Sequence, residues 1–170
     1  MRTVPLHGRV AAGRVALVDD TDFELVMAYR WYVYEQPRYG GKSVNGPYAF
    51  GRVPGPGAAG RPTVSMHTLI TGWARVDHAD GDGLNNQRSN LREATSAQNA
   101  ANSRPRTGGT SAFKGVCWVG GRRQCWTAQI RINRGTRFLG YFSDEVAAAR
   151  AYDAAAVAAW GPFARLNFPA

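Results

Sequence analysis

The sequence is poor in the residues that mark secreted, membrane-spanning and zinc-binding proteins. Its two cysteines, Cys117 and Cys125, are too few for a disulfide framework or a four-cysteine zinc site, and three histidines do not make up the shortfall. No apolar run approaches the roughly 18 residues that cross a bilayer, and the first residues lack the apolar stretch of a signal peptide. We therefore expect a cytoplasmic protein that is not secreted and has no membrane partner.

Acidic side chains are also scarce relative to basic ones. The 170-residue chain has a formal net charge of +9, which favours a polyanionic partner such as nucleic acid. The excess lies near the end of the chain: residues 104–170 carry ten basic and three acidic side chains, whereas residues 61–103 carry four of each. The C-terminal third is thus the expected electrostatic anchor.

Hydrophobic and turn patterns predict an α+β fold in several parts. Residues 1–62 form a small α/β segment of short strands and one helix. Residues 63–103 follow the order strand, loop, strand, helix, and Thr95 with Gln98 forms the capping box that begins this helix. Residues 104–110 are a linker by composition. Residues 111–170 predict a three-stranded antiparallel sheet packed on one helix, 144–160.

The last helix should be capped by Ser143 and should face the sheet with one apolar side. That side is formed by Val146, Ala149, Ala156 and Trp160. On the second of the three strands, CWTAQIRIN, alternate residues separate by polarity. Gln129 and Arg131 share the polar face with Cys125 and Thr127, and the opposite face is apolar and suits the helix.

An acidic stretch, VDHADGDG at 76–83, has two interpretations from its composition. It is either a polar turn, built from Asp and Gly for conformational reasons, or a metal site. Mg²⁺ needs only one or two side-chain oxygens besides water and phosphate, and histidine suits the role of a base near neutral pH. Asp77 and His78 supply such groups, and Asn99 or Asn102 could add an oxygen from the next helix.

Longer motifs in this region resemble the HNH (ββα-metal, His-Me finger) nucleases of the phage homing-endonuclease branch. The matching motifs are MHTLI at 66–70, VDH at 76–78, GDGLNNQRSNLR at 81–92 and T-x-x-Q-N-x-x-N at 95–102. The resemblance implies that His78 is the general base and that Asn90 orients it and holds the loop. Asp77 and Asn99 would hold one divalent cation, Mg²⁺ or Mn²⁺.

Other residues of this region have weaker assignments. Asp80 and Asp82 are expected to be turn formers. His67 and Arg92 are possible phosphate contacts. The N-terminal segment ALVDDTDFELV resembles one found ahead of such motifs. It has no assigned chemistry, but it could complete the nuclease unit or add DNA contacts through Arg30, Arg38 and Lys42.

The C-terminal motifs KGVCW, WTAQIRI and FLGYFSDEVAAARAYDAAAVAAWGPFARLNFP resemble the apetala-two DNA-binding domain of plant ethylene-response factors. Arginine suits both guanine and phosphate, and a small sheet can enter the major groove. The resemblance implies a DNA-binding sheet face made of Lys114, Trp118, Arg122, Arg123, Gln129, Arg131 and Arg137. Phe138 replaces a frequent tryptophan and Gln129 an acidic residue, which leaves the target sequence open.

Together these features predict a homing-type DNA endonuclease from a phage or mobile element in a bacterial host. The C-terminal sheet would hold double-stranded DNA while the central unit hydrolyses a phosphodiester bond. No small-molecule substrate is expected. One active centre per chain predicts a monomer that nicks one strand. The alternatives are a DNA-binding regulator of transcription that does not cut, and a nuclease specific for RNA or for DNA structure.

Overall fold

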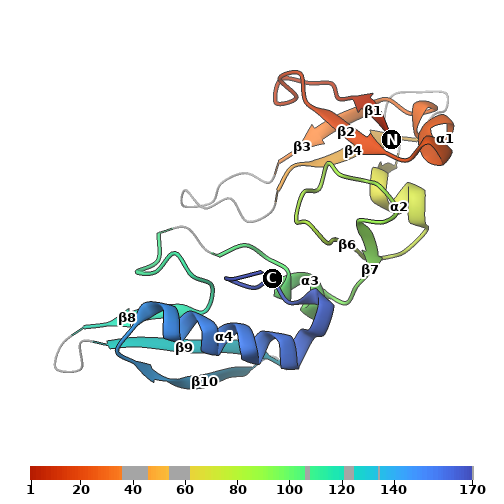
Figure 1. Cartoon of the computed structure of the whole chain (residues 1–170). Helices are drawn as coiled ribbons and strands as arrows, with labels where there is room; N and C mark the ends of the chain where they lie inside the picture. The colour runs from red at the N-terminus through yellow and green to blue at the C-terminus, as the bar shows by residue number, and fades with distance from the viewer. Residues whose placement is uncertain (36–45, 54–61, 106–107, 121–124, 134, 170) are drawn as a thin grey trace. The chain divides into compact units, whose positions relative to one another are not determined.

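The computed structural model describes residues 1–35, 46–53, 62–105, 108–120, 125–133 and 135–169 (Figure 1). The chain divides into two compact units, Met1–Ala94 and Thr95–Ala170, and each is described by itself. All sheets among the described residues are antiparallel and occur with helices, so the predicted α+β class is confirmed. The boundary after Ala94 falls inside the range 63–103. The expected domain ranges therefore stay a prediction.

The first unit contains three small sheets. Its elements are β1 (Arg2–Pro5), β2 (Val15–Val18), η1 (Asp20–Asp22), α1 (Phe23–Met27), β3 (Trp31–Tyr34), β4 (Tyr48–Arg52), β5 (Thr63–Ser65), α2 (Met66–Thr71), β6 (Val76–His78) and β7 (Leu91–Glu93). The sheets are β1-β2, β3-β4-β5 and β6-β7. β1 was not predicted, because four residues ending in proline give little periodic signal. The ambiguous stretch 63–73 is both strand and helix.

The core of the first unit follows the alternation of β3. Trp31 and Val33 are buried, whereas Tyr32 and Tyr34 between them are exposed. The Trp31 indole donates a 2.7 Å hydrogen bond to the carbonyl of Val26, so its polar atom is satisfied inside the core. A Cβ at Gly51, opposite Trp31 in β4, would lie 3.1 Å from the indole ring. The glycine lets the largest core side chain pack flat on the sheet.

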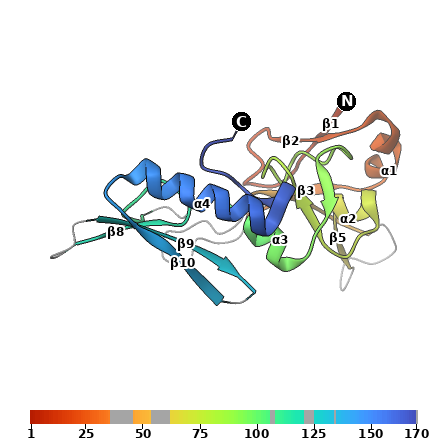
Figure 2. The same ribbon diagram turned by 60° about the horizontal axis from the view of Figure 1, so that its bottom comes forward.

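The second unit is a sheet covered by one long helix (Figure 2). Its elements are α3 (Ser96–Ala101), β8 (Val116–Val119), β9 (Cys125–Ile132), β10 (Gly135–Phe142), α4 (Glu145–Trp160) and η2 (Gly161–Phe163), with strand order β10-β9-β8. The predicted capping box of α3 is confirmed: Gln98 N donates to Thr95 Oγ1, and Thr95 N donates to Gln98 Oε1. The predicted three strands and helix are confirmed as well.

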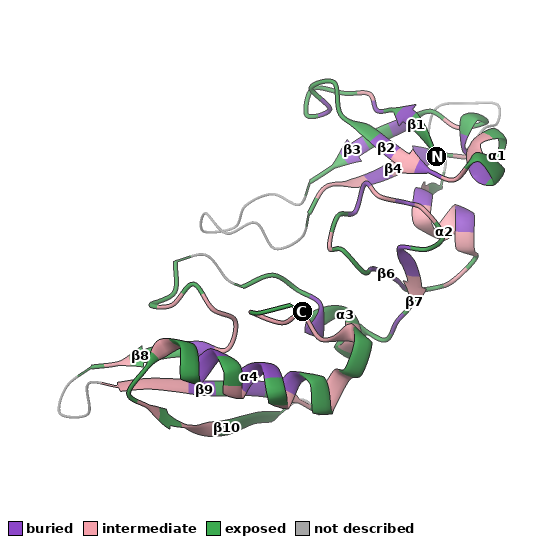
Figure 3. Cartoon of the chain, viewed as in Figure 1, coloured by how far each residue is buried: buried purple, intermediate pink, exposed green. Residues whose placement is uncertain are grey.

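Two details of α4 differ from the prediction. The helix is capped by Asp144, whose carboxylate accepts a 2.7 Å hydrogen bond from Ala147 N, and not by Ser143. Val146 is 38% exposed, so it does not face the sheet. The buried face instead contains Ala148, Ala149, Tyr152 and Ala156 (Figure 3). An ionised cap gains more from the helix dipole than a hydroxyl, which moves the start by one residue.

Small residues let α4 lie close to the sheet. Ala128 and Ala148 are completely buried in one cluster. A Cβ on Gly115 would lie 2.0 Å from the Tyr152 ring, and its φ of +76° also favours glycine. The chain end is tied to α4 because Asp153 accepts hydrogen bonds from the backbone amides of Asn167 and Phe168. The close approach therefore explains the alanine-rich sequence of this helix.

Candidate active site and nucleic-acid face

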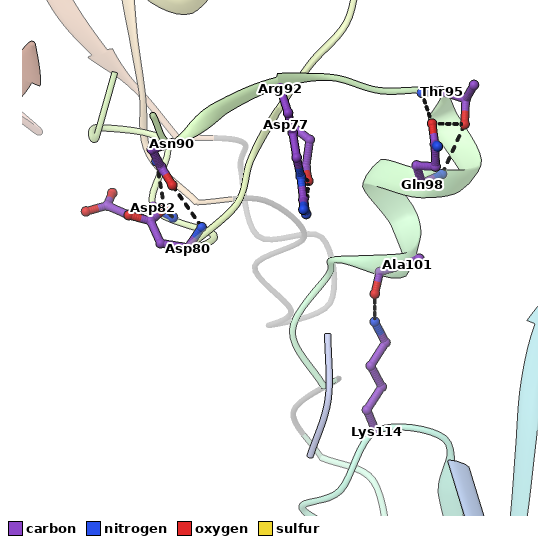
Figure 4. A network of polar contacts seen from close by, with 9 residues as sticks. All are labelled: Asp77, Asp80, Asp82, Asn90, Arg92, Thr95, Gln98, Ala101 and Lys114. Atoms are coloured by element: carbon purple, nitrogen blue, oxygen red, sulfur yellow. Dashed lines mark hydrogen bonds and ion pairs between the residues drawn. The ribbon is translucent and has the colours of Figure 1, made fainter. Parts of the chain in front are cut away.

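The acidic stretch places Asp77 and His78 on β6, where both are almost completely buried. Asp77 stands opposite Arg92 of β7 in the strand register. The Arg92 Nε and Nη2 atoms lie 2.8 Å and 2.6 Å from Asp77 Oδ2 (Figure 4). A buried carboxylate needs such a partner, because an uncompensated charge in this environment is strongly unfavourable. Arg92, expected as a phosphate contact, thus balances the charge of Asp77.

The His78 ring is oriented by Asn86, which is completely buried. His78 Nε2 lies 3.4 Å from Asn86 Oδ1, and Asn86 Nδ2 donates to the carbonyl of Leu84. Because the amide nitrogen is used in that bond, the oxygen must face the imidazole, and His78 Nε2 must carry the proton. The Nδ1 atom is then the nitrogen that can accept a proton.

Burial lowers the pKa of His78 below its usual value. The hydrogen bond with Asn86 and the charges of Asp80, Asp77 and Asp82 oppose this effect without cancelling it. The imidazole is therefore neutral at neutral pH. A neutral histidine with a fixed tautomer is the form that a general base requires.

Two rings, those of Tyr48 and His67, lie next to the His78 imidazole. The Tyr48 ring centroid lies 5.7 Å from that of His78 and 5.8 Å from that of His67, and the two imidazoles are 5.1 Å apart. Ser65 Oγ lies 2.9 Å from His67 Nε2. Within the described residues His67 Nδ1 is buried without a hydrogen-bond partner, and burial lowers the pKa of His67 to about 4. His67 is thus a neutral neighbour of His78, and its phosphate contact stays a prediction.

Asn90 holds the loop between β6 and β7. Its Oδ1 accepts from Asp80 N at 3.0 Å, and its Nδ2 donates to Asp80 Oδ1 (Figure 4). Its Nδ2 also donates to the carbonyl of Asn85. The Asp80 carboxylate accepts a hydrogen bond from Asp82 N, and the Asp82 carboxylate accepts one from Leu84 N. Turn-forming aspartates accept from the backbone two residues ahead in this way. The direct action of Asn90 on His78 stays a prediction, since the contact described above comes from Asn86.

The N-terminal segment supports the same loop from the other side. Arg88 donates two hydrogen bonds, of 2.9 Å and 2.8 Å, to the buried carboxylate of Asp22 and a third to the carbonyl of Ile70. Asp19 accepts from Gln87 Nε2 and Arg88 N. A bidentate pair of this kind fixes orientation as well as distance. The segment that lacked an assigned chemistry therefore completes the first unit.

The loop between β6 and β7 requires a glycine at position 83. A Cβ at this position would lie 2.5 Å from the carbonyl oxygen of Pro47 and 2.5 Å from the Tyr48 ring. The backbone of the loop therefore packs directly on the start of β4. This contact keeps the Tyr48 ring next to His78.

The oxygen donors of the predicted metal ligands fit a hard divalent cation in their chemistry. Mg²⁺ takes one or two protein oxygens, and a carboxylate and an amide are such donors. Asn99 lies exposed on α3 in the second unit, so its pairing with Asp77 stays a prediction from the resemblance. Among the described residues, no three His, Cys, Asp or Glu side chains form a group that could hold a metal ion.

The outer face of the C-terminal sheet exposes Gln129 and Arg131. Two residues expected beside them lie on the other face. Trp118 is opposite Trp126 in the register, with ring centroids 5.0 Å apart, and Arg137 is opposite buried Ile130. Directly opposed residues of antiparallel strands point to the same side, so both project from the face that α4 covers. Their placement with Arg131 was wrong, and their contact with DNA stays a prediction.

Lys114 has partners that the sequence did not indicate. Its Nζ donates to the carbonyl of Ala101, the last residue of α3 (Figure 4), and to the carbonyl of Ser103. Burial lowers the pKa of Lys114 to about 8, and the charge of Arg165 adds to the effect. This lysine therefore ties α3 to the sheet module. Arg122 and Arg123, like Arg38 and Lys42, lie outside the described residues.

The fold and the site show two functional parts in the chain. One is a nuclease-type strand-loop-strand-helix motif with a buried Asp-His pair. The other is a small module of one sheet and one helix with an exposed basic face. Residues 48–101 match the HNH endonuclease family model. The chain is also 59% identical over 46 residues to Dehydration-responsive element-binding protein 2A of Arabidopsis thaliana. The predicted combination of an HNH segment with an apetala-two-like segment is therefore confirmed.

These matches cover parts of the proteins only. The plant match spans 26% of this chain and 14% of the plant protein. No solved structure matches the chain significantly. No helix in the described part of the chain is both long and apolar enough to cross a bilayer.

Proposed function

We propose that this protein is a metal-dependent DNA endonuclease of the homing type, which nicks one strand as a monomer at a site held by the C-terminal sheet. The buried Asp77–His78 pair within the HNH-matching residues 48–101 is the observation that carries this proposal. The similarity to the plant element-binding protein and the net charge of +9 support double-stranded DNA as the substrate. A phage or mobile element in a bacterial cytoplasm is the proposed setting.

His78 is the proposed general base. Asn86 holds the proton on Nε2, so Nδ1 accepts the proton of the water that attacks phosphorus. Tyr48 and His67 pack around the imidazole and limit its rotation. Asn90 and Arg88 hold the loop that carries Asn86. The chain thus fixes the base before substrate arrives, which reduces the cost of orienting it in the reaction.

One divalent cation, Mg²⁺ or Mn²⁺, is the proposed cofactor, with Asp77 as a ligand and Asn99 as the second ligand that the resemblance implies. When bound, such an ion stabilises the charge on the phosphate and on the leaving oxygen. Arg92 holds Asp77 Oδ2 in the structure, so the residues that bind the cation have a cationic competitor. We expect weak metal affinity for this reason.

The experiment that tests the function is cleavage of a randomised duplex DNA library in the presence of Mg²⁺, with the cut ends mapped by sequencing. The wild type should produce 3′-hydroxyl nicks at a defined site, and His78→Ala should produce none. Structured RNA serves as a competitor, and preferential cutting of RNA would assign the activity to RNA. If the wild-type protein binds DNA but cuts no duplex in the library, the proposed nuclease function is wrong.

The ion pair between Arg92 and Asp77 favours one alternative, a DNA-binding regulator in which the metal site is idle. The two functions differ in their response to Mn²⁺. Calorimetric binding of Mn²⁺ that disappears in Asp77→Asn supports the nuclease. Absence of Mn²⁺ binding together with tight DNA binding supports the regulator.

A further inference from the structure

The outer face of the β3-β4-β5 sheet carries aromatic rings that the core does not use. Tyr32 is 40% exposed and Tyr34 is 49% exposed, on the side of β3 opposite to buried Trp31 and Val33. Phe50 of β4 stands opposite Tyr32 in the register, and its ring centroid lies 5.5 Å from that of Tyr34. These residues line a groove of about 400 Å³, together with Arg52 and Thr63. We call Tyr32, Tyr34, Phe50 and Arg52 the aromatic face.

Positive charge surrounds this groove. Arg52 is exposed in its lining, and the guanidinium carbon of Arg30 lies 5.9 Å from the centroid of the Tyr32 ring. Within the described residues neither arginine takes part in an ion pair. The nearby carboxylate of Glu35 is paired with Arg14. Exposed rings flanked by free guanidinium groups suit a partner that has both flat apolar surfaces and negative charge.

The aromatic face is continuous with the candidate active site. Tyr34 stands opposite Tyr48 in the strand register, so the two side chains project from the same side of the sheet. The Tyr48 ring in turn lies 5.7 Å from the ring of His78. Tyr48 therefore lies between the aromatic face and the proposed base, on the same side of the sheet as Tyr34.

We propose that the aromatic face binds a single strand of the DNA substrate beside the cut phosphate, with unstacked bases on Tyr32, Tyr34 and Phe50. Tyr32 and Tyr34 are two residues apart in β3, so they project from the same side of the sheet about 7 Å apart. Rings on a basic surface bind single strands through stacking and phosphate contacts, without reading the sequence. The inference rests on the proposed function, because it names where the nuclease holds its substrate strand.

The surface is less suited to other partners. A second copy of this chain would bring the same arginines together over the groove, and like charges oppose that contact. Duplex DNA keeps its bases stacked and offers no flat base surface to the rings. The cut strand should therefore be locally unpaired or distorted where it meets β3 and β4.

The test measures binding of a labelled oligo(dT) strand of about 15 nucleotides, the upper range for one small single-strand site. EDTA is present, so cleavage plays no part. The Kd should rise about tenfold in Tyr34→Ala, the loss expected for one base–ring stack. Tyr34→Phe keeps the ring and should stay within about twofold of wild type. The side chain is half exposed, so neither change should disturb the fold, which circular dichroism verifies.

A second measurement locates the strand. Photocrosslinking of 5-iododeoxyuridine in the same strand, followed by mass spectrometry, should mark Tyr32, Tyr34 or Phe50. Crosslinks confined to residues 111–170, with an unchanged Kd in the double variant Tyr32→Ala/Tyr34→Ala, would overturn the inference. Tighter binding of oligo(U) than of oligo(dT), or a dimer that Tyr34→Ala dissolves, would overturn it too.

The two proposals fail separately. A protein that nicks duplex DNA but binds oligo(dT) independently of Tyr32 and Tyr34 keeps the proposed function and loses the aromatic face. A protein that binds oligo(dT) through these rings but cuts no DNA keeps the surface and loses the proposed function.

Discussion

The two units of this protein hold the charged residues of their candidate sites in different ways. In the first unit, the carboxylates of Asp77 and Asp22 are buried, and each is paired with an arginine: Asp77 with Arg92, and Asp22 with Arg88. In the second unit, Arg131 stands exposed on a sheet whose other face is packed with alanines. Buried pairs fix geometry, whereas exposed cations remain available to an anion. The difference separates a region built to position a base from a region built to hold a polyanion.

Removal of Arg92 should have the largest effect on stability. Arg92→Met leaves Asp77 buried without its partner, and we expect a loss of about 3 kcal/mol in the free energy of unfolding of the first unit. Urea unfolding followed by tryptophan fluorescence measures this loss. The double variant Asp77→Asn/Arg92→Met removes both charges and should recover part of the stability. An unchanged midpoint in Arg92→Met would show that the buried pair does not matter.

Gly83→Ala should be the next largest change, about 2 kcal/mol, since overpacking forces the backbone to move. The new methyl group would lie 2.5 Å from Pro47 O and the Tyr48 ring. Nicking should fall together with stability, because the loop that carries Asn86 is displaced. Gly13→Ala provides a comparison at a glycine with no atoms nearby, although its φ of +77° adds strain of its own. Equal stability of Gly83→Ala and wild type would contradict the packing described.

Acid should weaken the first unit through His67. Its pKa is lowered to about 4 by burial, so the unfolded chain takes up a proton first as the pH falls. This contribution to stability is complete above the ordinary histidine pKa of 6.5 and is lost as the pH falls toward 4. His67→Gln should reduce the loss between pH 7 and pH 5 by about 1 kcal/mol. Identical pH dependence of the two proteins would exclude this burial effect.

Arg131→Ala should have the smallest effect on stability, because it should act only on DNA binding. We expect about a tenfold weaker Kd at moderate salt, a salt slope reduced by about one, and no change in unfolding. Arg150→Ala is the matched control, because it removes the same charge from α4, where Arg150 lies over Phe168. Equal losses of affinity in both variants would mean that total charge, and not the outer sheet face, holds the DNA.

The parts of the fold that follow local rules could be predicted from the sequence. The capping box at Thr95 and the alternation in Cys125–Ile132 depend on neighbours close in the chain, and both are confirmed. Residues whose role depends on distant partners were missed. Asn86 meets His78 only once the loop has folded, and Arg88 meets Asp22 across 66 positions.

Strand register caused the errors on the C-terminal sheet. The faces of Trp118 and Arg137 depend on which residue stands opposite, and a shift of one position reverses the face. In β10 the register shifts between Phe138 and Gly140, and such a bulge cannot be read from alternation. Sequence reasoning thus found the chemistry near His78 and the basic module, but not the contacts that orient them.

The measurement that tests the account most directly is single-turnover nicking of a mapped duplex site by the wild type and by His78→Ala, with DNA affinity measured on the same samples in EDTA. If His78 of the first unit is the base and the second unit holds the DNA, the nicking rate of His78→Ala should fall roughly 100- to 10,000-fold. Its Kd for DNA should stay the same as that of the wild type. A variant that nicks at the wild-type rate, with the same affinity, would contradict the assignment of His78 as the base.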